Sequence, residues 1–244
     1  MIPPVMTLSP ISSIFPRAMS KRLRILAGVA ALVGAAILAP SFAAPVAAAA
    51  AGNGSDTYPK LFGSSEIRSS KLAKFRKWTD TLKRYRAERL RERGKCRVTR
   101  VNRCRLARWR SFLRGLDGAP PRVQIERVNR YLNKLFYIVD PVNYGVKDYW
   151  ATPGQFFSKN GDCEDYAIAK YMSLRDLGFA VKDMRIVVLR DTNLKIAHAV
   201  LVVYFHGEPL VLDNQISQVV NANRIRHYKP IYSINESNWW LHRG

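Results

Sequence analysis

The sequence predicts an α+β fold in which amphipathic helices come first and an antiparallel sheet follows. Up to about residue 136, apolar residues recur at every third or fourth position, which indicates helices that bury one face. Beyond residue 184 the pattern changes to alternating or continuous apolar runs, which are typical of strands. One further helical stretch, starting near Asp162, lies between these halves. We therefore expect N-terminal helices and a central helix packed on an antiparallel sheet.

The N-terminal stretch resembles an export signal. Basic residues from Arg17 to Arg24 precede an apolar run from Ile25 to Leu38, and Ser41-Phe42-Ala43 has the small-x-small form of a cleavage site. The alternative is an uncleaved membrane anchor, but the apolar run is short for a membrane span and is followed by prolines. We expect a cleaved signal peptide over residues 1–44, a flexible Ala-, Gly- and Ser-rich lead-in over 45–65, and an exported domain over 66–244.

Three helices are predicted in the first half of that domain. They cover Lys71 to about Arg93, Leu106 to Leu116, and Arg122 to Phe136. Cys96 and Cys104 lie between the first two helices. In an oxidising compartment we expect these two cysteines to form a disulfide that closes a helical hairpin.

The net charge of +22 is concentrated in this helical segment. From Arg68 to Arg114 the chain has 19 Lys and Arg against 3 Asp and Glu. A solvated helix face is one interpretation, and weak contact with an anionic membrane surface or an acidic partner is another. Nucleic acid is not expected as a partner, because an exported protein does not meet it.

The second half of the domain is predicted to form strands at Met184–Arg190, His198–Phe205 and Pro209–Asp213. A turn at His206-Gly207-Glu208 would make the last two an antiparallel hairpin. Simple counting along this hairpin puts Asp213 nearer Val202 than His198, so a bulge or a shorter turn is required to bring Asp213 to His198. We expect the tail, with Trp239-Trp240, to pack back on the sheet.

Between the two halves, one cysteine lies among three carboxylates in the stretch Asn160-Gly161-Asp162-Cys163-Glu164-Asp165. At the start of a helix, backbone N–H groups and the helix dipole favour a thiolate, whereas the adjacent acids oppose it. Because Cys96 and Cys104 are expected to pair, Cys163 is the odd thiol. A buried inert cysteine is the alternative, but its acidic neighbours differ from the apolar surroundings of a core cysteine.

A nucleophilic thiol needs a base and a group that orients this base. Of the four histidines only His198 opens a clear strand, and Asp213 closes the next strand at the same end of the hairpin. The order of the three residues fits a Cys–His–Asp triad, although such residues alone do not establish one. The oxyanion hole would use the Cys163 backbone N–H and a second donor, for which Trp150, Gln155 and Asn160 remain open.

Longer motifs surround these residues. The stretch Gly161–Tyr171 closely resembles the cysteine motif of the bacterial transglutaminase-like cysteine peptidases, while His198–Val202 and Val211–Asn214 look like the His and Asp motifs of that family. The likeness extends from about Phe75 to Trp239, since Asp148-Tyr149-Trp150 and the helix with Asn129 and Asn133 also fit.

This resemblance implies a papain-like or transglutaminase-like cysteine protease fold, with Cys163 as nucleophile, His198 as base and Asp213 as the orienting group. It also implies calcium dependence and a protein substrate. Characterised members work in the periplasm, where they cut large surface adhesins and so release cells from biofilms. An inner-membrane receptor for cyclic di-GMP sequesters them. The resemblance therefore implies a surface adhesin and such a receptor as partners.

The acids beside the cysteine agree with a calcium site. Asp162, Glu164 and Asp165 are hard oxygen ligands on one helical turn and suit Ca²⁺ better than a transition metal. They do not form an EF-hand loop, so the choice of calcium rests on the resemblance. Bound Ca²⁺ would offset the acids beside Cys163. The alternative is that Asp162 caps the helix while the other two favour its first turn.

Two other functions remain open from the residues. The same triad serves acyl transfer to an amine in transglutaminases, and the sequence does not distinguish water from an amine as the acceptor. A catalytically inactive binding module using the basic helices is the third interpretation, although the presence of the Cys, His and Asp together argues against it. Zinc is not expected, because no Cys-x-x-Cys or His-x-x-x-His spacing occurs.

Overall fold

The computed structural model of the chain describes residues 58–92, 94, 96–100 and 103–244. The predicted signal peptide at 1–44, and the lead-in as far as residue 57, lie outside the described residues. Among the residues that are described, none of the helices has both the length and the apolarity that a membrane span needs.

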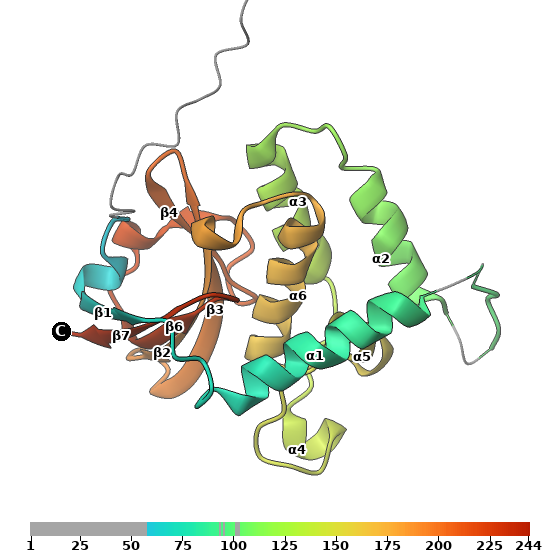
Figure 1. Cartoon of the computed structure of the whole chain (residues 1–244), viewed down its shortest axis with the longest axis horizontal. Coiled ribbons are helices and arrows are strands. Elements are labelled where there is room, and N and C mark those ends of the chain that lie inside the picture. The colour runs from blue at the N-terminus through green and yellow to red at the C-terminus, as the bar shows by residue number, and fades with distance from the viewer. Residues whose placement is uncertain (1–57, 93, 95, 101–102) are drawn as a thin grey trace, which may run out of the picture. The chain divides into compact units, whose positions relative to one another are not determined.

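Helices lie on one side of the domain and a sheet lies on the other (Figure 1). The helices are α1 Arg76–Arg91, α2 Arg105–Arg114, α3 Pro121–Leu132, α4 Asp140–Asn143, α5 Pro153–Lys159 and α6 Cys163–Asp176. The strands are β1 Ser65–Ser69, β2 Met184–Asp191, β3 Ile196–Phe205, β4 Glu208–Leu212, β5 Val220–Asn221, β6 Tyr228–Ile234 and β7 Trp239–Arg243. In the described part of the chain they form one 7-stranded sheet in the order β1-β7-β6-β2-β3-β4-β5, and every neighbouring pair is antiparallel. The predicted α+β arrangement is therefore confirmed.

Helix α6 is the central element of this fold. It packs on β2 and β3 of the sheet and is covered by α3 and α5. All residues from Asp165 to Leu174 are buried, including the charged side chain of Lys170. The sequence pattern predicts a single apolar stripe on this helix, but protein surrounds it on every side.

The sheet is covered on both faces. Leu201 and Leu212 point toward α6, while Val200 and Val202 belong to a second apolar cluster on the opposite face. This alternation follows from the two-residue period of a strand. Leu61, which has no exposed surface, joins the second cluster, and the Tyr58 ring stacks on Tyr204 with centroids 4.3 Å apart. The folded domain therefore starts before the predicted boundary at residue 66.

The hairpin between β3 and β4 has a shorter turn than the predicted three residues. Phe205 pairs with Glu208, so that only His206 and Gly207 form the turn, and both have positive φ values of 51° and 79°. Such a two-residue turn matches the twist of the flanking strands. The shorter turn shifts Asp213 toward the His198 end of β3, and no bulge is needed.

The predicted disulfide is present, since Cys96 and Cys104 are joined by an S–S bond. Cys104 directly precedes α2, and Cys163 is the free cysteine among the described residues. The C-terminal tail packs on the sheet as predicted, in the form of the antiparallel strands β6 and β7. Both β1 and α5 are elements that the sequence pattern does not predict.

Candidate active site

Cys163 is the first residue of α6, and its side chain faces β3. The backbone N–H of Ala199, the residue that follows His198, is directed at the sulfur and favours the thiolate. The thiol also lies 3.1 Å from Glu164 Oε2, to which it donates. The fold therefore brings the helix-borne thiol to the strand that carries the predicted base.

His198 and Asp213 form a buried pair in the sheet. His198 Nε2 lies 3.0 Å from Asp213 Oδ1, and the two residues have exposed fractions of 2% and 0%. The Tyr228 hydroxyl donates to Asp213 Oδ2, and the Gln215 N–H donates to Oδ1 over 2.8 Å. Burial alone would raise the pKa of Asp213, but the interactions with His198 and the hydrogen bond from Tyr228 outweigh it and lower that pKa. An ionised Asp213 therefore holds the His198 ring through one of its nitrogens.

Two asparagines of α3 hold the loop that contains Asp213. Asn133 Nδ2 donates to the backbone oxygen of Asp213 over 2.7 Å, and Asn129 Nδ2 donates to that of Ser217 over 3.2 Å. These are the asparagines that fit the family pattern in the sequence. Their place in the structure explains the fit, because they hold from outside the sheet the loop with the carboxylate that is predicted to orient His198.

Asp162 and Asp165 converge with a third acid, Asp140, which the sequence analysis missed. Ligand oxygens of the three side chains lie within 4.8 Å of one another, and all three residues are buried. Asp162 occupies the N-cap of α6, yet it makes no side-chain cap hydrogen bond. Its Oδ2 instead accepts the backbone N–H of Asp140 over 3.3 Å. We call these three residues the acid cluster.

One oxygen of each carboxylate in the acid cluster has no hydrogen-bond partner among the described residues. These atoms are Asp140 Oδ1, Asp162 Oδ1 and Asp165 Oδ2. Burial is the main cause that raises the pKa of each group, and neighbouring acids add to it. Buried carboxylates with free oxygens are costly unless a proton or a cation compensates them. The acid cluster therefore fits a hard cation.

Glu164, the other predicted ligand, faces the thiol. Besides its contact with Cys163, it has an oxygen within reach of Asp140 and Asp148, in a second acidic group that shares Asp140 with the acid cluster. Burial, with the charge of Asp162, raises the pKa of Glu164 to about 8. Burial, together with the Glu164 and Asp162 carboxylates, also raises the pKa of Cys163. A cation at the acid cluster would counter this effect on the thiol.

Gly161 allows the acid cluster to assemble. A Cβ atom at this position would lie 2.1 Å from Asp165 Oδ2, a distance that excludes any other residue without rearrangement. The preceding residue, Asn160, has a φ of 64°, and its Oδ1 accepts a hydrogen bond from Arg105 over 3.3 Å. The Asn-Gly pair thus makes the close approach of the backbone to Asp165 possible.

The three open candidates for the second oxyanion donor are engaged elsewhere. The Trp150 ring packs in the core against Trp78, with centroids 6.2 Å apart. Gln155 closes the capping box of α5, and Asn160 binds Arg105. None of these side chains is directed at Cys163 by a hydrogen bond among those of the described residues.

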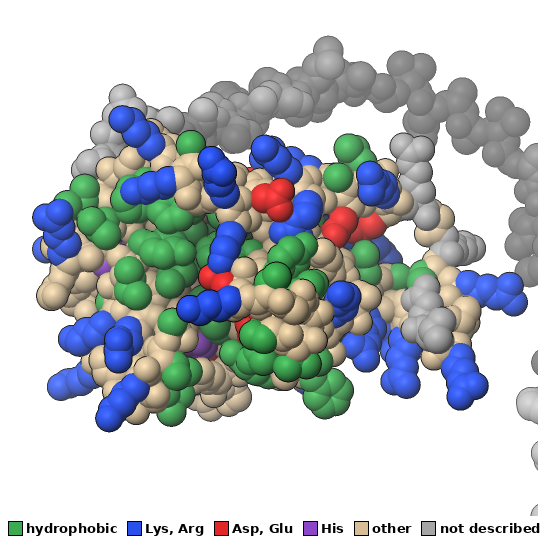
Figure 2. All heavy atoms as spheres, turned by 90° about the horizontal axis from the view of Figure 1, so that it is seen from below, with side chains coloured by type: hydrophobic (Ala, Val, Ile, Leu, Met, Phe, Trp, Pro, Cys, Tyr) green, Lys and Arg blue, Asp and Glu red, His purple; other side chains and the backbone are tan. Residues whose placement is uncertain are grey.

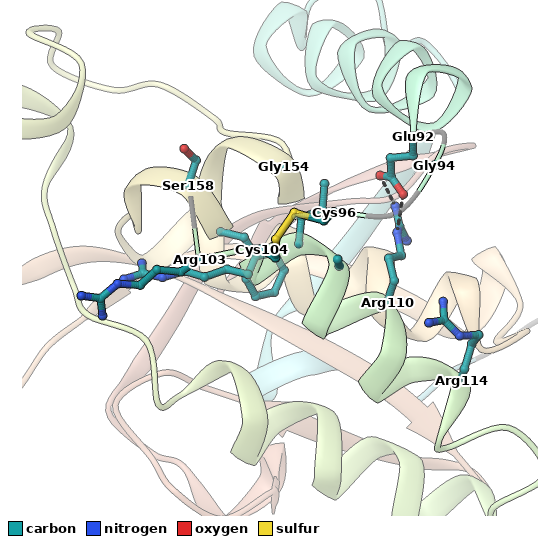
Figure 3. A pocket seen from close by; sticks show the side chains of 13 residues that line it. Glu92, Gly94, Cys96, Arg103, Cys104, Arg110, Arg114, Gly154 and Ser158 are labelled. Atoms are coloured by element: carbon teal, nitrogen blue, oxygen red, sulfur yellow. Dashed lines mark hydrogen bonds and ion pairs between the residues drawn. A yellow bond between two sulfur atoms is a disulfide. The ribbon is translucent and has the colours of Figure 1, made fainter. Parts of the chain in front are cut away.

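A cavity of about 930 Å³ lies away from Cys163, near the disulfide. Figure 3 shows it between the end of α1, the start of α2 and α5, with Arg110 directed at Glu92. Its basic lining consists of Arg103, Arg105, Arg110 and Arg114. On the face drawn in Figure 2, Lys and Arg side chains are widely spread while acidic side chains are few. The cavity is therefore a basic surface feature whose lining does not include Cys163.

Comparison with known proteins agrees with this geometry. The sequence model described as bacterial transglutaminase-like cysteine proteinase matches residues 101–242. The structure is similar to Legionella pneumophila LapG, with 31% sequence identity, a TM-score of 0.54, and coverage of 67% of this chain and 86% of that one. The calcium-bound LapG structure gives the same values, and the EGTA-treated structure differs only in its own coverage of 84%. No match among curated proteins reaches significance.

The fold and these similarities define a cysteine peptidase with a transglutaminase-like fold. The chain belongs to the bacterial transglutaminase-like cysteine proteinases. The fold, the enzyme class and the family resemblance predicted from the sequence are thereby confirmed.

Proposed function

We propose that this peptidase is an exported, calcium-dependent endopeptidase that cuts a protein substrate with the triad Cys163, His198 and Asp213. The contact of His198 Nε2 with Asp213 Oδ1, on the strand that also binds the Cys163 sulfur through Ala199, carries this proposal. Membership of a proteinase family favours hydrolysis over acyl transfer to an amine, and it favours an active enzyme over a binding module.

In the proposed reaction, His198 takes the thiol proton and Asp213 stabilises the imidazolium that results. The sulfur bonds to the carbonyl carbon of the substrate, and the electron pair of the carbonyl moves to its oxygen. When this pair returns, the C–N bond breaks and the leaving amine takes its proton from His198. Water, deprotonated by His198, then hydrolyses the thioester and frees the sulfur.

Calcium dependence is supported by the acid cluster, where three buried carboxylates each have an oxygen without a partner among the described residues. It is also supported by the similarity to LapG, which is known in calcium-bound and EGTA-treated forms. Bound calcium would supply positive charge beside Cys163 and so favour the thiolate. Asp162 connects the proposed calcium site with the helix that carries the nucleophile, because it is the N-cap residue of α6 and its carboxylate accepts the backbone N–H of Asp140.

The substrate and the cellular setting extend this proposal. The predicted signal peptide and the family resemblance support a periplasmic enzyme that cuts a large surface adhesin, with a role in biofilm release. An inner-membrane cyclic di-GMP receptor is the regulatory partner that this setting would supply. The basic side chains near α1 and α2 would add weak attraction to anionic lipid.

The test is cleavage of the N-terminal region of a large adhesin from the same organism by the purified protein. We expect cleavage in calcium, no cleavage in EGTA, and recovery when calcium is restored. Cys163→Ala and His198→Asn should abolish cleavage. His206→Asn is the matched control, since His206 lies in the hairpin turn at the far end of β3 and has positive φ, which Asn tolerates. Cleavage by the Cys163→Ala protein would overturn the proposal.

A further inference from the structure

A loop segment between α3 and α4 runs directly beside the start of α6. Tyr137 pairs with Gly161 in an isolated parallel bridge, and the Ile138 N–H donates to the Gly161 oxygen over 2.9 Å. The Tyr166 hydroxyl donates to the backbone oxygen of Leu135. These contacts hold the backbone of Tyr137 against the segment that precedes the thiol.

The side chain of Tyr137 reaches the nucleophile. Its hydroxyl lies near Cys163, Asp162 and Glu164, and the backbone N–H of Cys163 is directed at the hydroxyl oxygen. One side of its ring is next to the Tyr166 ring, with centroids 6.4 Å apart and planes inclined by 20°. The residue is nevertheless 51% exposed, so the ring has an open side toward which it can turn.

The backbone N–H of the nucleophilic residue is a donor that a tetrahedral intermediate on Cys163 would use. The Tyr137 hydroxyl therefore occupies the place that the carbonyl oxygen of a substrate has to enter. A hydroxyl group both accepts and donates hydrogen bonds. When the substrate oxygen displaces the Tyr137 hydroxyl slightly, the hydroxyl can therefore donate a hydrogen bond to that oxygen. The side chains of Trp150, Gln155 and Asn160 are engaged elsewhere.

We propose that Tyr137 is a catalytic residue that donates the second hydrogen bond of the oxyanion hole, an inference that rests on Cys163 being the nucleophile. As the C–S bond forms, the carbonyl electron pair moves to oxygen, which accepts hydrogen bonds from the Cys163 N–H and the Tyr137 O–H. As the C–N bond breaks, the pair returns to the carbonyl and the amine takes its proton from His198. Tyr137 keeps its proton throughout.

The surroundings of Tyr137 keep this proton in place. Burial of the hydroxyl, followed by the charges of Cys163, Asp162 and Glu164, raises the pKa of Tyr137 above its ordinary value. The phenol is then a donor across the whole neutral range. The competing interpretation is a gate, in which Tyr137 only covers the Cys163 N–H and has to leave before substrate binds.

Two small reagents separate these roles, because one needs an oxyanion hole and the other does not. Acylation by p-nitrophenyl acetate passes through a tetrahedral oxyanion, whereas alkylation by iodoacetamide is a direct displacement at carbon. Both rates are measured on the calcium-loaded full chain, with Cys163→Ala as background. In Tyr137→Phe we expect acylation to be slower by about 10- to 1000-fold, as for other oxyanion donors, and alkylation to change less than about twofold.

Tyr131→Phe is the matched control, because this tyrosine stacks on Phe112, away from the thiol, and should leave both rates unchanged. Unchanged acylation in Tyr137→Phe would overturn the proposal, faster reaction with both reagents would indicate the gate, and an equal loss with both would indicate that Tyr137 only positions Cys163. If wild type and Cys163→Ala react equally, the proposed nucleophile has failed, which is a different result.

Discussion

His198 and Asp213 are hydrogen-bonded at 3.0 Å although they are not cross-strand partners. The register pairs Leu201 with Leu212, which sets Asp213 opposite Val200, two residues from His198 on the same face. Side chains related by this diagonal offset come within reach of each other in an antiparallel pair. The two-residue turn at His206-Gly207 produces the offset, so the geometry of the pair depends on a turn at the far end of the hairpin.

Replacing Asp213 with Asn should keep the fold but remove the charge that stabilises the His198 imidazolium. We expect kcat to fall by about 10²–10⁴-fold, as for other triads, with KM nearly unchanged. Tyr228→Phe, which removes one hydrogen bond to Asp213, should have a smaller effect. Asp117→Asn, at an exposed position after α2, is the control. Activity near the wild-type level in Asp213→Asn would exclude its role as the orienting group.

The acid cluster can be distinguished from the second acidic group by paired variants. Asp165 belongs only to the cluster with Asp140 and Asp162, and Asp148 belongs only to the group with Asp140 and Glu164. We expect Asp165→Asn to weaken calcium binding by about tenfold or more, because it removes a charged ligand, and Asp148→Asn to change it less than about twofold. Calorimetric titration with calcium measures both. The reverse order would place the ion in the second group.

The buried Lys170 should lower the free energy of unfolding at neutral pH. Its side chain is buried, its Nζ has no hydrogen-bond partner among the described residues, and burial lowers its pKa to about 7. In the unfolded chain the lysine keeps its proton up to a pKa near 10.4. Between about pH 7 and pH 10 the unfolded chain therefore binds more protons than the folded protein, so the free energy of unfolding should rise with pH over this range.

Lys170→Met should remove that pH dependence and raise the free energy of unfolding at pH 7 by about 1–3 kcal/mol. Urea unfolding at pH 7 and pH 9 measures both effects. Lys134→Met, at an exposed position, is the control. A loss of stability in Lys170→Met would mean that the buried amine makes a favourable interaction in the protein.

His242 should make the protein sensitive to acid. Its Nδ1 lies 2.8 Å from Ser64 Oγ and its Nε2 lies 2.9 Å from Ser233 Oγ, and burial lowers its pKa to about 4. Below about pH 6.5 the unfolded chain binds a proton that the folded protein excludes, so stability falls as the pH is lowered toward 4, by up to about 3 kcal/mol. His242→Gln should reduce this slope in unfolding measurements. His206→Asn, in the hairpin turn, should leave it unchanged.

The disulfide should contribute to the free energy of unfolding and not to peptidase activity. It joins Cys96 and Cys104 over a sequence separation of 8, and a loop of that size corresponds to about 2.5 kcal/mol of reduced entropy in the unfolded chain. The double replacement by Ser should lower the free energy of unfolding by about 2 kcal/mol, with peptidase activity changed less than about twofold. A large loss of activity in a protein that is still folded would connect the disulfide to the site, through Arg105 and Asn160.

The sequence predicts the helices α1, α2, α3 and α6 and the strands β2, β3 and β4, because each has a local pattern, and the motifs that resemble the family indicate the candidate triad. It misses β1, since Ser65–Ser69 contains a single apolar residue and finds its partner strand only in the folded protein. It also misses Asp140, where the Asp-Pro pair indicates only the end of a helix. Capping by Asp162 is predicted from its position, but the carboxylate binds the Asp140 N–H instead, a contact across 22 positions.

Tyr137 is another residue whose place in the site the sequence does not predict. No local pattern distinguishes it from the neighbouring apolar residues Phe136 and Ile138. Its contact with Cys163 follows from the bridge to Gly161, which depends on how α3 and α6 pack. Residues that act through tertiary contacts of this kind leave no signal in one sequence.

The pairing of β1 with β7 sets an order for folding. Ser65 lies opposite Arg243 and Ser69 opposite Trp239, so the first described strand has to wait for the last one. The β2–β3–β4 hairpins need only short loops, and contacts between near neighbours in sequence form fastest. We therefore expect β3, which carries His198, to pair with β2 and β4 early and β1 to pair with β7 late. The part of the sheet that carries His198 would then form before the edge of the sheet.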